Sequence, residues 1–139
     1  MEFTAHQFGR AVQSLGSFNR SAASTDGTVV DCLGYEECLV VADFGLATGA
    51  GTADVTVRQS VNADGSASTA VTGATFAQVV AANDNTAFVG RIKLSGVQRY
   101  LFARVVGDGA NGVQCSVDFV LMNPKYPPAT QVNANAFSV

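Results

Sequence analysis

Residues 37–46 read E-C-L-V-V-A-D-F-G-L, and residues 90–106 read G-R-I-K-L-S-G-V-Q-R-Y-L-F-A-R-V-V. Between them, after a Gly-Ala-Gly turn, residues 53–61 read A-D-V-T-V-R-Q-S-V. Apolar and polar side chains alternate in these stretches. Such alternation is typical of a β-strand with one buried face, because successive side chains point to opposite faces of a sheet. We therefore expect an all-β protein.

The same pattern continues on both sides of this stretch. It predicts about seven strands, near 28–33, 37–46, 53–62, 75–81, 86–95, 99–106 and 112–122. The pairs Asp64-Gly65, Asp108-Gly109 and Asn111-Gly112 tolerate the positive φ of tight hairpins. No strand–helix–strand unit is visible, so we expect an antiparallel β-sandwich of seven or eight strands, with jelly-roll-like or immunoglobulin-like topology. The chain has no Trp, which excludes a true immunoglobulin domain.

The apolar phase of each strand predicts the core. The expected core side chains are Val40, Ala42, Phe44, Val55, Val57, Phe76, Phe88, Ile92, Leu94, Val117, Phe119 and Leu121. In residues 99–106 both phases are apolar, since Tyr100 and Phe102 oppose Leu101, Ala103 and Val105. That strand is expected to be buried on both faces, either centrally in the sandwich or against a second subunit.

Residue composition and pattern divide the 139 residues into three zones within one domain. Residues 1–24 are expected to be an N-terminal arm with one strand near Ala11–Phe18. Residues 25–123 form the sandwich, and residues 124–139 form a tail whose prolines favour extended backbone.

Both end zones carry large apolar side chains in backbone that cannot bury them locally. These are Phe3, Phe8, Tyr126, Val132 and Phe137. We expect them to be partner-binding anchors on extended arms, because a partner must supply the surface that such a segment lacks. The alternative is that both ends fold back on their own sandwich.

The composition limits the classes of partner that the chain is expected to bind. Only 14% of the residues are charged and the net charge is −3, which suits a surface partly covered by other subunits. The eight Lys and Arg are scattered, so nucleic-acid binding is not expected. No apolar run approaches the roughly 20 residues of a membrane span, and the first residues lack a secretory pattern. The three cysteines, Cys32, Cys38 and Cys115, are therefore expected to be free thiols. Whether Cys32 and Cys38 pair is left open.

No catalytic, cofactor or metal site is predicted. The single histidine, His6, has no partner spaced as in a hydrolase. Residues 83–85 and 107–111 are Asp/Asn clusters without a calcium-loop pattern, and the Asp side chains there are better explained as turn residues. Three Cys and one distant His do not make a zinc site. The pattern favours a binding or assembly module over an enzyme.

The order of strands resembles a known family. The runs L-V-V-A-D-F-G, D-V-T-V-R-Q-S, V-T-G-A-T-F and G-R-I-K-L-S-G-V-Q-R-Y-L-F-A-R-V-V look like the small β-sandwich head decoration (cement) proteins of tailed bacteriophages. The resemblance covers roughly residues 37–126 and includes Arg99-Tyr100-Leu101 and the exit Asn123-Pro124-Lys125. The long N-terminal arm lies outside this pattern.

The resemblance implies a structural virion protein on the outer capsid surface, made in the host cytoplasm. Its expected partners are the major capsid protein and further copies of itself, as trimers, and it needs no cofactor. A head-fibre base, a tail component or a receptor-binding module is the alternative virion role. A carbohydrate-binding module is a third reading, because Tyr35, Tyr100 and Tyr126 could form a sugar platform.

Overall fold

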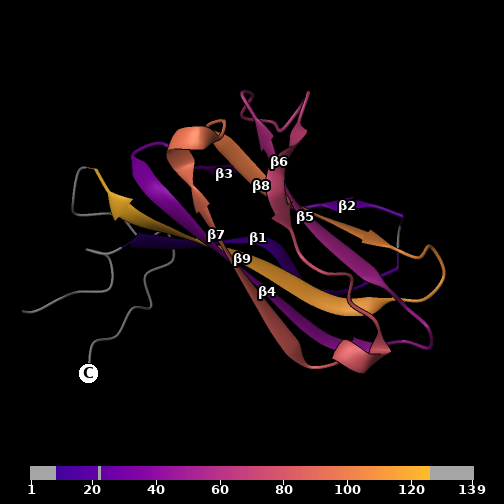
Figure 1. The fold of residues 1–139 in the computed structure, drawn as a ribbon. Helices are drawn as coiled ribbons and strands as arrows, with labels where there is room; N and C mark the ends of the chain where they lie inside the picture. The colour runs from indigo at the N-terminus through magenta and orange to yellow at the C-terminus, as the bar shows by residue number, and fades with distance from the viewer. Residues whose placement is uncertain (1–8, 22, 126–139) are drawn as a thin grey trace, which may run out of the picture.

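The computed structural model describes residues 9–21 and 23–125, which form two antiparallel β-sheets packed face to face (Figure 1). Sheet A has the strand order β1 (Gly9–Arg20), β9 (Val113–Pro124), β4 (Tyr35–Ala47), β7 (Thr86–Lys93). Sheet B has the order β2 (Thr25–Asp26), β8 (Tyr100–Gly107), β5 (Ala53–Ser60), β6 (Thr69–Thr75), and β3 (Val30–Asp31) also pairs with β8. Two 3₁₀ turns, η2 (Ala81–Asn83) and η3 (Leu94–Gly96), flank β7. The expected antiparallel sandwich is confirmed.

The core lies between the sheets, and the predicted phase is confirmed in its central strands. The fully or almost fully buried members of the expected set are Val40, Ala42, Phe44, Val55, Val57, Ile92, Val117, Phe119 and Leu121. Phe76, Phe88 and Leu94 are only partly buried and pack against this core from its edge. Phe88 lies on β7, which is an edge strand, and Leu94 lies in η3, which leaves the sheet. Their positions in the fold explain why they are only partly buried.

In the described part of the zone expected as an N-terminal arm, the chain forms a strand of the sandwich. The strand expected near Ala11–Phe18 exists as β1, but it is an integral strand of sheet A, paired with β9 from Gly9↔Met122 to Arg20↔Val113. Without β1, the long strand β9 would be an edge with a row of unpaired backbone groups. Pairing satisfies those groups and also buries Leu15 in the core.

Ser14 ties the two sheets together at this side of the sandwich. It lies at an irregularity in the β1–β9 register and is only 3% exposed. Its hydroxyl donates to the carbonyl of Thr28 at 3.0 Å and accepts the backbone N–H of Ala103 in β8 at 3.0 Å. The backbone of Gly27 lies close to Ser14, because a Cβ there would lie 2.5 Å from the Ser14 Oγ. One buried hydroxyl thus satisfies backbone groups from two segments.

Two expected strands differ in position. Residues 75–81 do not form a strand; β6 ends at Thr75, and Val79 makes only an isolated bridge to Ala53. Only Val71 of β6 is buried, so this edge strand carries little of the alternation that reveals a strand. Residues 28–33 contain only the two-residue strand β3, preceded by the two-residue strand β2.

The two-sided burial expected for residues 99–106 is found at Phe102, whereas on the same outer face Tyr100 is only half-buried and Val106 is exposed. Leu101, Ala103 and Val105 lie in the core between the sheets. Phe102 points to the other face and is still only 3% exposed. The cover comes from the β5–β6 connection of the same chain, since the Gly65 backbone packs against the Phe102 ring and Val29.

Turn chemistry accounts for the aspartates as expected. The carboxylates of Asp64 and Asp108 accept backbone N–H groups two residues ahead, at 2.9 Å in each case. Each is followed by a glycine with positive φ, 75° at Gly65 and 84° at Gly109. Gly112 differs from expectation, because its φ is not positive. A Cβ there would lie 1.4 Å from the Asn19 Oδ1, so a larger residue would displace the Asn19 side chain.

The Ser14 bridge predicts a specific loss of stability. Ser14→Ala leaves the Ala103 N–H and the Thr28 carbonyl without their buried partner, and we expect the free energy of unfolding to fall by about 1–3 kcal/mol. Ser17→Ala, on the exposed face of the same strand, should change it by less than about 0.5 kcal/mol. Urea denaturation of both variants measures the difference, and equal losses would contradict the bridge.

Candidate interaction surfaces

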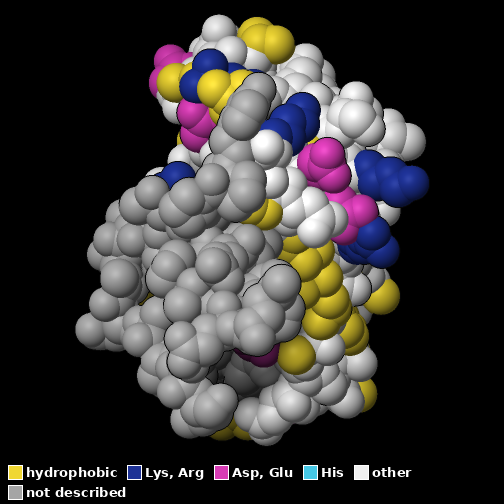
Figure 2. Space-filling view, turned by 90° about the vertical axis from the view of Figure 1, so that its left-hand side faces the viewer, with side chains coloured by type: hydrophobic (Ala, Val, Ile, Leu, Met, Phe, Trp, Pro, Cys, Tyr) yellow, Lys and Arg dark blue, Asp and Glu magenta, His cyan; other side chains and the backbone are white. Residues whose placement is uncertain are grey.

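The outer face of sheet A carries an apolar strip, defined here as Leu39, Val41, Val89 and Val120. Leu39 pairs with Val120 of β9, and Val41 pairs with Val89 of β7, so the four side chains are cross-strand neighbours on one face. Val89 is 61% exposed, and the other three are half-buried. Figure 2 shows one face of the molecule, where hydrophobic side chains gather in a strip below a group of acidic and basic side chains.

The sequence contains a signal for this strip that the search for a core overlooks. Leu39 and Val41 occupy the opposite phase to the buried Cys38, Val40 and Ala42, so the run of residues 38–42 is apolar on both faces of β4. A strand that is apolar on both faces needs cover on both. The core covers one face, and no described residue covers Val89 on the other. An exposed valine among half-buried apolar neighbours makes this face a candidate interaction surface.

Charges border the strip. At one end Arg91 forms a two-pronged ion pair with Glu37, the cross-strand neighbour of Lys93. At its centre Asp118 lies opposite Val41. Burial, and then the nearby charge of Asp43, raises the pKa of Asp118 above its ordinary value. The fold therefore holds this carboxylate in a partly desolvated position, where its ionised form is disfavoured.

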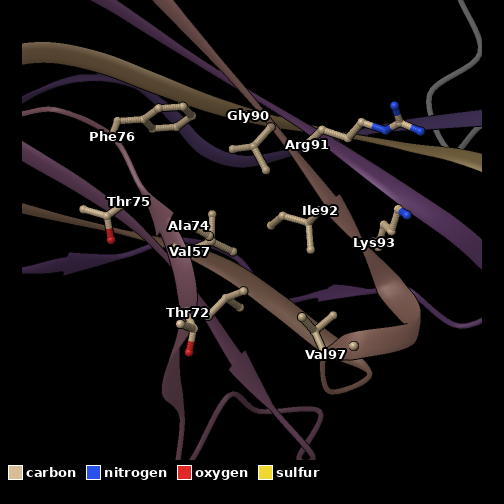
Figure 3. A pocket seen from close by; sticks show the side chains of 14 residues that line it. Val57, Thr72, Ala74, Thr75, Phe76, Gly90, Arg91, Ile92, Lys93 and Val97 are labelled. Atoms are coloured by element: carbon tan, nitrogen blue, oxygen red, sulfur yellow. The ribbon is translucent and has the colours of Figure 1, made fainter.

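A groove opens between β6 and β7, the edge strands of the two sheets (Figure 3). Its volume is about 320 Å³. The apolar side chains that line it come from both sheets: Val40, Val57, Val71, Ile92 and Val97. Phe76 closes one end, with its ring stacked toward Phe88 at 5.9 Å between centroids and close above Gly90. Arg91 and Lys93 stand at the rim.

A second hollow of about 340 Å³ adjoins this groove at the end of sheet A. Tyr35, Glu37 and the start of η3 form its walls together with Lys93, which also borders the groove. Lys125 lines the same hollow, anchored by its backbone N–H to the Gly34 carbonyl at 2.8 Å. The described chain therefore ends beside the entrance to the groove.

The cysteines are buried free thiols, as expected, and Cys32 and Cys38 are not paired. Burial raises the pKa of both Cys32 and Cys38 to about 12, so both stay protonated at neutral pH. A protonated, buried thiol is a poor nucleophile and behaves as a small apolar side chain.

Other kinds of site find little support among residues 9–21 and 23–125. No group of three His, Cys, Asp or Glu that could hold a metal occurs in these ranges. The carboxylate of Asp84 accepts the Ala47 N–H at 2.8 Å, and that of Asp108 accepts two backbone N–H groups, so both aspartates serve the turns. The same ranges contain no helix with the length and hydropathy needed to cross a bilayer.

The five anchors expected from the sequence lie outside the described residues. Phe3, Phe8, Tyr126, Val132 and Phe137 precede Gly9 or follow Lys125, and their role stays a prediction. The apolar strip and the groove are candidate interaction surfaces that were not predicted from the sequence. The groove had no signal in any single strand, because it arises where two edge strands from different sheets face each other.

Comparison with known proteins places the fold. No protein-family model matches the chain, and no curated protein is similar to it in sequence. The PBSX exported protein XepA superposes with a TM-score of 0.57 at 16% identity, over 90% of this chain and 44% of that one. The structure of infectious bursal disease virus, Gx strain, gives 0.51 at 12% identity, over 86% of this chain and 33% of that one. The chain thus spans less than half of either neighbour, and what it shares with them is a β-sandwich fold.

The raised pKa of Asp118 predicts a pH-dependent gain from Asp118→Asn. Because the folded state binds this proton more tightly than the unfolded state, the ionised carboxylate costs stability at neutral pH, and the cost vanishes below the ordinary pKa of 3.8. We expect the variant to raise the free energy of unfolding at pH 7 by up to about 1 kcal/mol, since solvent still screens this partly exposed group. At pH 3 wild type and variant should be equal. Denaturation at both pH values tests this, and a loss at pH 7 would contradict it.

Proposed function

We propose that this chain is a structural virion protein, a decoration or cement protein that binds the outside of a phage head and stabilises contacts between major capsid subunits. The apolar strip on the outer face of sheet A carries the proposal. It gives a small, lightly charged sandwich an apolar outer face on which Val89 is 61% exposed and its three apolar neighbours are half-buried. The resemblance of residues 37–126 to head decoration proteins supports it, as does the sandwich fold shared with a phage exported protein and a virus structure.

The strip suits a rigid capsid surface for a physical reason. Its side chains are mostly β-branched and are held by strand pairing, so little side-chain entropy is lost when they are covered. The charged groups, Arg91 with Glu37 at one end and the partly desolvated Asp118 at the centre, fix orientation more than they add affinity. The role is therefore binding, without a catalytic step.

Attachment at several points makes such a small surface sufficient. Beyond the strip, we propose that Phe3, Phe8, Tyr126, Val132 and Phe137 anchor the terminal segments on capsid protein or on neighbouring copies. Burying one Phe contributes roughly 1.5–3 kcal/mol, which offsets the ordering of a short arm. Linked contacts then multiply avidity, and assembly of copies as trimers multiplies it again.

A different virion part is the second candidate. The likeness to a phage exported protein favours it, because that protein is named as exported and not as part of a head. A head-fibre base, a tail component or a receptor-binding module would use the same exposed strip on another partner. Binding assays on separated heads and tails distinguish these roles.

Two valines of equal exposure give a matched test. Val89 in the strip is 61% exposed, and Val61, in the β5–β6 connection of sheet B, is 67% exposed. Val89→Glu places a charge in the proposed interface and should weaken binding to undecorated heads by about tenfold or more, or about 1.4 kcal/mol. Val61→Glu should bind like wild type.

Co-sedimentation with undecorated heads measures both affinities, and circular dichroism confirms that both variants fold. Equal binding by the two variants would remove sheet A from the interface. Failure of the wild-type chain to bind heads at all would overturn the decoration role.

A further inference from the structure

The edge strands β6 and β7 present backbone that the described residues leave unpaired on one side. Within those residues β7 pairs only with β4, and β6 pairs only with β5. An edge strand exposes a row of N–H and C=O groups that readily pairs with a further strand. Here the two edges flank the apolar groove, so an added strand would gain backbone hydrogen bonds and apolar burial together.

The groove accepts small and medium apolar side chains. In Figure 3, Ile92, Val57 and Val97 lie around its interior, with Ala74 of β6 beside them. Ala74 adds only a methyl group to the lining, while Phe76, packed over Gly90, closes one end. An added strand places every second side chain on one face, about 7 Å apart, which matches a shallow, elongated apolar floor.

The chain itself supplies a segment of this kind. Residues 129–139 read A-T-Q-V-N-A-N-A-F-S-V, in which Val132, Ala134 and Ala136 alternate with Asn133 and Asn135. Alternation of small apolar and uncharged polar residues is the pattern of a strand with one buried face. The segment is comparable in length to β7, which has eight residues.

The exit of the chain leads to this groove from outside. Lys125 lines the hollow whose opposite wall, at Lys93, also borders the groove. Because β9 and β7 are both antiparallel to β4, both end at this same end of sheet A. In every copy, Lys125, the last described residue, is therefore close to the end of the β7 edge. Copies arranged around one axis can exchange segments when these two places are close together.

The connecting residues favour a neighbouring copy over the copy's own groove. To enter its own groove, the chain would have to reverse direction between Lys125 and Ala129. Those positions hold Tyr126, Pro127 and Pro128, and a second proline is disfavoured at the third position of a type I turn, whereas a type II turn needs Gly or Asn there. Adjacent prolines favour extended polyproline backbone over a tight reversal.

We propose that the groove between β6 and β7 binds residues 129–139 of a neighbouring copy, which adds as a strand to the β7 edge. Each copy then donates one segment and receives another, and such head-to-tail contacts close into a ring when the rotation between copies allows it. This contact would link copies of the chain to one another, and it does not depend on capsid binding.

Cysteine cross-linking in the full-length chain tests the proposal. Copies carrying Val89→Cys on β7 are mixed, by co-refolding, with copies carrying Asn133→Cys or Asn135→Cys. The native thiols are buried and serve as an internal background. We expect oxidation to give disulfide-linked pairs of chains, whereas Val61→Cys, matched in exposure, gives at least about tenfold fewer.

A second pair of variants blocks the groove without touching the segment. Ala74→Glu places a charged side chain inside the groove, and Ala70→Glu makes the same change at an exposed position of the same strand. Light scattering should show that self-association weakens by about tenfold or more in the first variant and is unchanged in the second. An absence of cross-links between chains, or equal self-association of the two groove variants, would overturn the proposal.

Discussion

The hydrogen bonds of Ser14 close one side of the sandwich, and the shape of the rest follows from that closure. Ser14 lies in β1 of sheet A, and its hydroxyl accepts from Ala103 in β8 of sheet B. The carbonyl of Ser14 also accepts the Thr28 N–H at 2.7 Å, which holds the segment leading to β3 against the same side. With this side joined, the sheets can separate only at the opposite side, between β6 and β7. The groove is found there.

Two surfaces remain open after the core is built, and they differ in kind. The apolar strip of sheet A is flat and formed by side chains, which suits a preformed partner surface. The groove is concave and bordered by unpaired backbone, which suits an extended segment. We propose that this lightly charged chain uses one surface for a large assembly and the other for its own copies.

Much of the fold could be predicted from the sequence wherever alternation was strong. Phe119 and Val117 in β9, and Val40 in β4, are buried as their phase indicated. Edge strand β6 escaped detection because only Val71 of its residues is buried. Ser14 could not be recognised, since a serine that bridges two sheets looks like any surface serine until long-range pairing brings Ala103 to it. The groove likewise depends on which strands become edges, a property of topology that no local pattern carries.

The most direct test of the central claim is a cryo-electron microscopy reconstruction of phage heads incubated with the purified chain. We predict density for the β-sandwich on the outer surface of the capsid. In that density, the outer face of sheet A, at Leu39, Val41 and Val89, should be turned toward the major capsid protein. A head without added density would contradict the account, as would a sandwich bound with that face turned to solvent.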